Sequence, residues 1–243
     1  MNSAIVSITN VSKSFGNQQI LEDVSLTVGT GEIFGLLGPS GSGKTTLVKM
    51  MMGIESINSG NISIAGLEIP SFEAKKIIGY MAQSDALYLD LTAKENLEFF
   101  GSLYGLKGKK LKERIQLVME MVDLQNHLHK TLHQYSGGMK RRLSLAISLL
   151  HEPKLLILDE PTVGIDPVLR KSIWGQFQTL TKQGTTIFLT THVMDEAEKC
   201  DRLGLIQNGK LIVNDTPEKM KEMYRVNTLE EIFLAVGGAA HDH

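Results

Sequence analysis

The stretch that decides the fold is the run Gly38-Pro39-Ser40-Gly41-Ser42-Gly43-Lys44-Thr45. It matches the pattern G-x-x-x-x-G-K-[ST] at every fixed position. Residues 32–37 in front of it are typical of a buried strand, and residues 46–52 behind it are typical of a helix that ends at Gly53. A Gly/Ser turn that matches by chance is disfavoured, because a phosphate-binding loop needs a strand and a helix on these two sides.

The residue types in this run are suited to binding phosphate groups. Gly38, Gly41 and Gly43 allow positive φ angles and a close approach of the backbone to a ligand. Successive N–H groups and the positive end of the following helix then attract an anion. Lys44 would bring a charge to the β- and γ-phosphates, and the hydroxyl of Thr45 would reach Mg²⁺.

Two carboxylates follow a second apolar segment. Residues 155–158 form an unbroken apolar run, as expected for a parallel strand buried on both faces, and Asp159 and Glu160 come directly after it. Ligands of open α/β sheets bind at this end of the strands. An Asp here can hold Mg²⁺ and a Glu can accept a proton from water, although an acidic turn is an equal alternative without the upstream loop.

A Ser-Gly-Gly run completes the pattern. Ser136 can cap a helix that begins near Gly137, so that backbone N–H groups point at an anion; an ordinary capped helix is the alternative. With the loop and the carboxylates, the run Tyr135-Ser136-Gly137-Gly138-Met139 resembles the signature of the ATP-binding subunits of ABC transporters. This resemblance covers the chain from about residue 5 to about residue 236.

The resemblance implies an α/β fold of the P-loop NTPase class, with a mostly parallel central sheet flanked by helices, an N-terminal antiparallel β region and a helical insert. Independently, strand-like and helical segments alternate over residues 155–199, which indicates a parallel sheet with crossover helices. The expected organisation is one ATPase domain over residues 1–236 with a flexible tail at 237–243. The helical subdomain would span about 84–152, and a hairpin with short helices would span about 203–236.

Further roles follow from the resemblance alone. Gln83 matches the Q-loop glutamine, which senses Mg²⁺ and water, and His192 matches the switch histidine at the γ-phosphate. Asp166 matches the D-loop at the subunit interface, and Phe15 matches the aromatic residue that stacks on adenine. Each also has a structural alternative: a solvated glutamine, a histidine at a strand end, an Asp-Pro helix start and a half-buried hairpin aromatic.

The predicted site is therefore as follows. The residues expected to contact ATP are Phe15, Gly38, Pro39, Ser40, Gly41, Ser42, Gly43, Lys44, Thr45, Thr46, Ser136, Gly137, Gly138 and Asp166. The catalytic residues are Lys44, Gln83, Glu160 and His192, and the Mg²⁺ ligands are Thr45, Gln83 and Asp159.

Three motifs depart from the family pattern: the signature has Tyr135 and Met139 where Leu and Gln are commoner, the D-loop has Ile165 where Leu is usual, and Phe15 stands where Tyr is usual. The signature variant and residues 91–100 resemble the drug-resistance and lipid-export (ABC-2 type) branch. Thr92 and Glu95 also form a capping box for a helix.

The expected partners follow from the lack of a membrane-spanning run and from the family resemblance. No run is long enough to span a bilayer, so the pore is expected on separate membrane-spanning permease subunits, with this chain at the cytoplasmic face of the membrane. A homodimer or heterodimer with a second ATPase subunit is implied, with two ATPs between the subunits. The net charge of −2 disfavours a nucleic-acid surface. Residues 107–114 are expected to form the solvated face of a helix, with lipid head groups a weaker alternative.

The rival hypothesis is a soluble, non-transport ABC ATPase acting on ribosomes or DNA. A single ATPase domain and the absence of a long coiled coil between Gln83 and Ser136 disfavour it. The transported substrate is not encoded in a chain of this kind.

Other features predict no further chemistry. Cys200 is the only cysteine, which excludes an internal disulfide. His127, His129 and His133 are expected in a solvated loop rather than at a metal. Asn208-Gly209 predicts a type I′ hairpin, and the histidines at 241 and 243 end the expected tail.

Overall fold

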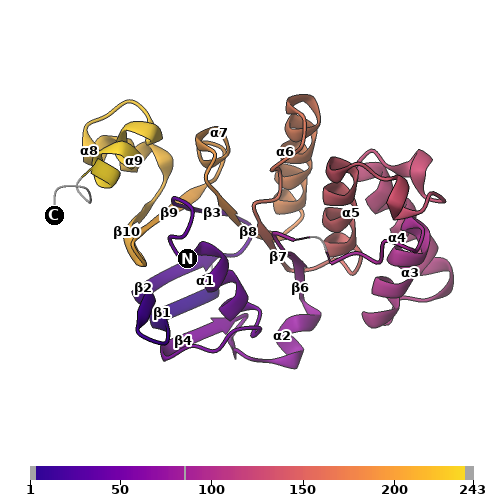
Figure 1. Cartoon of the computed structure of the whole chain (residues 1–243), viewed down its shortest axis with the longest axis horizontal. Helices are drawn as coiled ribbons and strands as arrows, with labels where there is room; N and C mark the ends of the chain where they lie inside the picture. The colour runs from indigo at the N-terminus through magenta and orange to yellow at the C-terminus, as the bar shows by residue number, and fades with distance from the viewer. Residues whose placement is uncertain (1–3, 85, 239–243) are drawn as a thin grey trace.

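The computed structural model of the protein describes residues 4–84 and 86–238 and is built around two sheets (Figure 1). The strand order is β10-β9-β3-β8-β7-β6 in the larger sheet and β2-β1-β4-β5 in the smaller one. The strands are β1 (Ala4–Phe15), β2 (Gln18–Gly29), β3 (Ile33–Leu37), β4 (Ser59–Ile64), β5 (Leu67–Glu68), β6 (Ile78–Met81), β7 (Leu155–Asp159), β8 (Thr186–Thr191), β9 (Arg202–Gln207) and β10 (Lys210–Asp215). The helices are α1 (Lys44–Met51), α2 (Phe72–Lys76), α3 (Ala93–Leu103), α4 (Gly108–Met121), α5 (Gly137–Leu149), α6 (Pro167–Lys182), α7 (Met194–Ala197), α8 (Pro217–Tyr224) and α9 (Leu229–Gly238), with short 3-10 turns at Gln125–His127 and Leu132–Gln134.

The larger sheet is parallel except at one edge. Strands β6, β7, β8, β3 and β9 pair in parallel, and β10 pairs antiparallel with β9. All residues of β3, β7 and β8 are buried, which explains the unbroken apolar run at residues 155–158. The β9–β10 hairpin turns at Asn208 and Gly209 with φ angles of 48° and 76°, as the predicted type I′ turn requires. The predicted fold class is confirmed.

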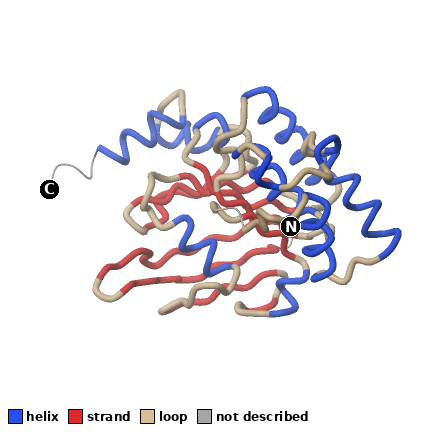
Figure 2. The backbone as a smooth tube through the Cα atoms, turned by 45° about the vertical axis from the view of Figure 1, so that its right-hand side comes forward, coloured by secondary structure: helices blue, strands red, loops and turns tan. Residues whose placement is uncertain are grey.

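The smaller, antiparallel sheet packs beside α1 and the larger sheet. Phe34 of β3 and Phe188 of β8 stack with ring centroids 5.5 Å apart in the apolar cluster that these elements share. Figure 2 shows the strands of the two sheets close together, with one helix between them and the other helices along their outer sides. The predicted N-terminal antiparallel region is therefore part of the same core.

The helical insert lies to one side of the larger sheet, on the right in Figure 1. Its α3 begins with the predicted capping box: Thr92 Oγ1 accepts from the Glu95 N–H at 3.2 Å, and the Glu95 carboxylate accepts from the Thr92 N–H at 2.7 Å. In α4, Ile115 and Val118 are buried and Leu111 packs against the core. The lysines of α4 lie on its other, exposed face.

One predicted helix start is wrong by two residues. The helix after the phosphate-binding loop begins at Lys44 rather than at residue 46, because Gly43, with a φ of 102°, already serves as its N-cap. Within the alternating segments predicted over residues 155–199, the last helix is short and spans Met194–Ala197. Helix α9 spans Leu229–Gly238, and the histidines at 241 and 243 lie outside the described residues.

The histidine-rich segment before α5 shows no metal cluster. Within residues 4–84 and 86–238, no group of three or more His, Cys, Asp or Glu side chains is arranged to hold a metal ion. His133 instead lies 2.9 Å from Asp90, and Cys200 is a buried free thiol. Among the helices described, none combines the length and the apolar character that a membrane crossing needs.

A stacked pair of rings joins the helical insert to the sheet. Tyr104, at the end of α3, stacks on His151 with centroids 3.6 Å apart and planes within 3°. His151 Nε2 donates to the Ile78 carbonyl of β6 at 3.0 Å. Burial lowers the pKa of His151 from 6.5 to about 4, because the charged ring would lose its hydration.

We expect this ring to make the fold sensitive to mild acid. As the pH falls below 6.5, the unfolded chain binds a proton at His151 that the folded chain excludes, so stability is lost between about pH 6.5 and pH 4. Between pH 7 and pH 5 the loss should be about 2 kcal/mol. Urea unfolding of the wild type and of His151→Phe, which keeps the stack, measures it. Equal pH slopes for the two proteins would contradict the assignment.

Candidate functional site

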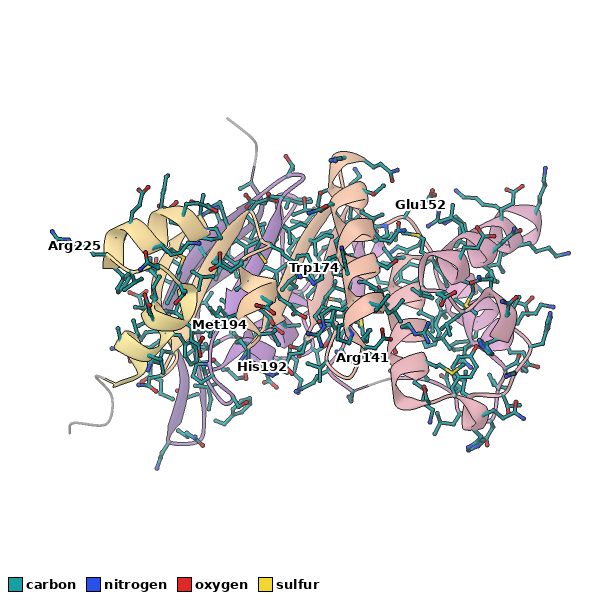
Figure 3. All side chains as sticks on the ribbon, turned by 90° about the horizontal axis from the view of Figure 1, so that it is seen from above. Arg141, Glu152, Trp174, His192, Met194 and Arg225 are labelled. Atoms are coloured by element: carbon teal, nitrogen blue, oxygen red, sulfur yellow. The ribbon has the colours of Figure 1, made fainter. Side chains whose placement is uncertain are left out.

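The predicted site residues converge at the carboxyl edge of the larger sheet. The phosphate-binding loop follows β3, and His192 follows β8. Asp159 is the last residue of β7, and Glu160 comes directly after it. In the sheet, Leu37 pairs with Thr191, and Asp159 pairs with Thr190. Because these three strands are parallel neighbours, the segments that leave them lie side by side. In Figure 3, Arg141 and His192 lie toward one side of the molecule and Glu152, which precedes β7, lies toward the other.

Two positions of the loop need glycine because there is no space for a Cβ atom. A Cβ at Gly38 would lie 2.3 Å from the Ile206 carbonyl oxygen of β9. At Gly43 it would lie 2.5 Å from Leu21 Cδ2 of β2, and the φ of 102° is in the left-handed region. The loop is therefore held between β9 and the β1–β2 hairpin. Pro39, Ser40 and Gly41 form its less buried tip, and Thr45 and Thr46 lie half-buried in the first turn of α1.

Lys44 is buried under the loop. Its Nζ donates to the Gly38 carbonyl at 2.8 Å and to the Pro39 carbonyl at 2.9 Å. Burial lowers the pKa of Lys44, and the charges of Glu160 and Asp159 oppose this shift. The ammonium group is thus held in reach of both the loop and the carboxylates.

Asp159 has an unused acceptor. Its side chain is fully buried, and Oδ1 accepts from the Thr190 hydroxyl. Oδ2 has no hydrogen-bond partner among the described residues, and neither does the buried Ser42 Oγ of the loop. Buried polar atoms of this kind are rare and call for a ligand. A buried carboxylate oxygen without a partner is the kind of oxygen ligand that Mg²⁺ prefers, so Asp159 fits this ion.

Glu160 sits in a strained backbone conformation between two predicted catalytic residues. Its φ of 52° is uncommon for a residue with a Cβ, and its N–H donates to Thr190 Oγ1 at 3.0 Å. One carboxylate oxygen lies 3.0 Å from His192 Nδ1, and the other lies 3.5 Å from Gln83 Nε2. The structure therefore brings together Gln83, Glu160 and His192, which come from three separate segments.

Arg141 was missed by sequence reasoning. Its buried guanidinium donates to four carbonyl oxygens at 2.5 to 2.8 Å: those of Ala82, Gln83, Asp159 and Glu160. It therefore fastens α5 to the backbone of the segments that carry Gln83 and Glu160. The sequence shows two adjacent arginines at the start of this helix, and nothing local indicates which one turns inward.

Ser136 and Asp166 line the same cavity. Each caps a helix as predicted: Ser136 Oγ accepts from the Met139 N–H at 3.2 Å, and Asp166 Oδ1 accepts from the Leu169 N–H at 3.0 Å. A cavity of about 360 Å³ is lined by Ser136, Gly138, Gly164 and Asp166, among others. Gly137 begins α5 with open space around its Cα. This cavity does not include Lys44, Asp159 or Glu160.

Phe15 ends β1 and is about half exposed, beside the hairpin that contacts the loop. Lys13 Nζ lies 4.8 Å from the centre of its ring and is held by Glu55 at 2.7 Å. Phe15 pairs with Gln18, and the carbonyl of Ile20 on the same strand lies against Gly43. The position suits both alternatives, a hairpin aromatic and a platform for a base.

We expect Arg141 to be needed for the integrity of this site. In Arg141→Lys, one ammonium group cannot reach four carbonyls, and buried acceptors left without a donor cost about 1–3 kcal/mol. Urea unfolding should show a loss of that size. The matched control is Arg142→Lys, whose partly exposed guanidinium donates to the carbonyls of Val122 and Asp123 and lies 4.0 Å from the Asp123 carboxylate. Equal effects of the two substitutions would refute the bracing role.

Known proteins resemble this chain in sequence and in structure. The sequence profile described as ABC transporter matches residues 21–163. The probable multidrug ABC transporter ATP-binding protein YbhF of Escherichia coli (strain K12) is 42% identical over 219 residues, covering 89% of this chain and 38% of that protein. The Nod factor export ATP-binding protein I of Rhizobium sp. (strain N33) is 39% identical over 236 residues, covering 96% of this chain and 78% of that protein.

Some of these relatives are much longer than this chain, which spans 38% of YbhF and 64% of the Nod factor export protein of Sinorhizobium fredii (strain NBRC 101917 / NGR234). Among solved structures, an ATP-binding subunit of an ABC transporter superimposes with a TM-score of 0.89 at 27% identity, covering 96% of this chain and 99% of that one. A bacterial ABC transporter cassette solved as a dimer gives a TM-score of 0.81 at 25% identity, with coverage of 87% and 98%.

Proposed function

The chain belongs to the ABC transporter family, and from this premise we propose that it is the Mg²⁺-dependent ATPase subunit that powers export through separate membrane-spanning subunits. The family implies ATP binding and hydrolysis. The observation that carries the proposal is the cluster at the carboxyl edge of the sheet, where Glu160 lies 3.0 Å from His192 beside the buried Lys44 and Asp159.

The loop would bind the phosphates of ATP. Its backbone N–H groups and the N-terminus of α1 supply partial positive charge, which stabilises an anion. Lys44 would exchange its bonds to the Gly38 and Pro39 carbonyls for oxygens of the β- and γ-phosphates. Phe15, with Lys13 beneath its ring, would stack on the adenine.

Thr45, Asp159 and Gln83 are the residues that would hold Mg²⁺. The unpartnered Asp159 Oδ2 supports this assignment from within the structure. When bound, the ion neutralises charge on the phosphate oxygens.

Glu160 would act as the general base. It would orient a water molecule toward the γ-phosphorus and accept the proton that this water releases on attack, while the bond from the γ-phosphorus to the bridging oxygen breaks and ADP leaves. His192 and Gln83, at 3.0 and 3.5 Å from its carboxylate oxygens, keep that carboxylate aimed into the site. Most of the acceleration would come from positioning and from charge stabilisation by Lys44 and the loop.

The site would be completed by a second ATPase subunit. Ser136 and Gly138 at the start of α5, with Asp166, line a cavity separate from the Lys44 cluster. In a head-to-tail dimer, this surface of each subunit would cover the γ-phosphate bound by the other. The dimeric structure of a related cassette supports such an arrangement, which suits a homodimer as well as a heterodimer.

A groove beside Gln83 is suited to a membrane-spanning permease subunit. It is lined by residues of β6, α3, α5 and the loop after β6, which include Met81, Leu87, Phe100 and Ile147. The exposed Tyr88 and Phe99 pack edge to face with their ring centroids 5.0 Å apart, and both rings lie next to Phe100. Because Arg141 bonds the Gln83 carbonyl and the Glu160 carbonyl, motion at the groove would reach the catalytic residues. The chain would then lie on the cytoplasmic face of the membrane.

The proposed unit is one ATPase domain over residues 1–236, with the helical subdomain at about 84–152 and the hairpin and short helices at about 203–236. Relatives named for multidrug transport and for Nod factor export support export as the direction. The rival, a soluble ATPase acting on ribosomes or DNA, differs in its partner. A multi-spanning membrane protein that co-purifies in equal amount from native membranes supports transport, and recovery only with ribosomes or DNA-binding proteins supports the rival.

Glu160→Gln is the variant that tests the proposed chemistry. It should bind ATP normally, lose at least about 100-fold in kcat because the amide cannot accept the proton, and accumulate as an ATP-bound dimer. ATPase assays and sedimentation in ATP measure this. Glu152→Gln, an exposed position before β7, is the control and should behave as wild type. Normal turnover by Glu160→Gln would rule out the general-base assignment.

A further inference from the structure

Glu196 is a buried carboxylate for which the proposed chemistry gives no role. It lies on the short helix α7, which follows His192, and only 2% of it is exposed. Burial raises the pKa of Glu196, opposed by a hydrogen bond from Thr191 and by the charges of Arg170, Lys199 and His192. A carboxylate in such a place lowers stability unless it is well bonded.

Its two oxygens are bonded to two different loops of the site. Oε2 accepts from the Thr191 hydroxyl at 2.8 Å, and Oε1 accepts from the Thr162 hydroxyl. Thr191 ends β8 directly before His192, and its Oγ1 also accepts from the Val193 N–H at 3.0 Å. Thr162 lies just after Glu160. The Glu196 carboxylate therefore links the segment that carries Glu160 to the segment that carries His192, and these two side chains lie 3.0 Å apart.

A third connection leads to Asp166. Arg170 Nε of α6 lies 4.0 Å from Glu196 Oε1, and the same guanidinium donates to the Ile165 carbonyl at 3.2 Å. Asp166, the next residue, caps α6 and lines the cavity with Ser136. The carboxylate thus shares its bonds among the Glu160 segment, the His192 turn and the segment that leads to Asp166.

We propose that Glu196 is a positioning residue that holds His192 opposite Glu160 and fixes the segment 162–166 relative to both. This inference rests on the proposed function, because it assigns a role in the same hydrolytic site. Glu196 touches neither the phosphate-binding loop nor Phe15 in any contact described. Its loss should therefore reduce turnover while leaving ATP affinity unchanged.

The test uses Glu196→Gln in the full chain. The amide keeps one acceptor oxygen but cannot accept from the second hydroxyl, and it has no charge to offer Arg170. We expect kcat to fall by about 10-fold or more and the Kd for ATP to change by less than about 2-fold. The control is Glu198→Gln, two residues further along, where the carboxylate is exposed and pairs with Lys221 at 2.8 Å.

A second readout does not depend on activity. The ring signals of His192 in ¹H–¹⁵N spectra, assigned by their loss in His192→Gln, should shift in Glu196→Gln and stay in place in Glu198→Gln. Thr162→Val removes one of the two hydroxyl bonds with little change of shape. It should shift the same signals and lower kcat even where Glu196→Gln folds poorly.

The outcomes distinguish the positioning role of Glu196 from the proposed ATPase function. Wild-type kcat together with unmoved His192 signals in both Glu196→Gln and Thr162→Val would overturn the positioning role and leave the proposed function intact. A wild-type chain that binds no ATP would overturn the proposed function. Even in that case, a shift of the His192 signals caused by Glu196→Gln would still support the structural link through Glu196.

Discussion

The parallel alignment of β3, β7 and β8 is the constraint on which the rest of the structure depends. It places the phosphate-binding loop, the Asp159–Glu160 pair and His192 at one edge of the sheet, although they are far apart in the sequence. The apolar strands can be buried on both faces because helices and the smaller sheet cover them. Polar groups are therefore concentrated where the strands end, and that edge carries the chemistry.

Two buried charged side chains brace this edge from opposite sides. Arg141 reaches from the helical insert to the carbonyls of Asp159 and Glu160, and Glu196 ties the segment after Glu160 to the turn at His192. Both act through hydrogen bonds to groups of other segments, which fix distances more sharply than apolar contacts do. The catalytic geometry is thus linked to the groove beside Gln83 on one side and to the surface at Asp166 on the other.

The sequence predicted the parts of this site that are local patterns. The loop at Gly38, the carboxylates after β7 and the caps at Ser136 and Asp166 each follow from a short stretch of residues with its own physical reason. Arg141 and Glu196 could not be found in this way, because their partners lie in segments that only the fold brings near. The start of α1 was misplaced for a similar reason, since Gly43 caps it with a left-handed backbone next to Leu21 of β2, which only the fold brings near.

The central claim is that each complete ATP site combines the loop of one subunit with the Ser136 surface of another. Mixing two inactive variants tests it most directly. Lys44→Ala destroys the loop, and Ser136→Arg blocks the surface that faces the partner's nucleotide. Each alone should be inactive, but their mixed dimers contain one intact site, so an equal mixture should recover about a quarter of the wild-type ATPase rate. A mixture that stays as inactive as its components would contradict the account.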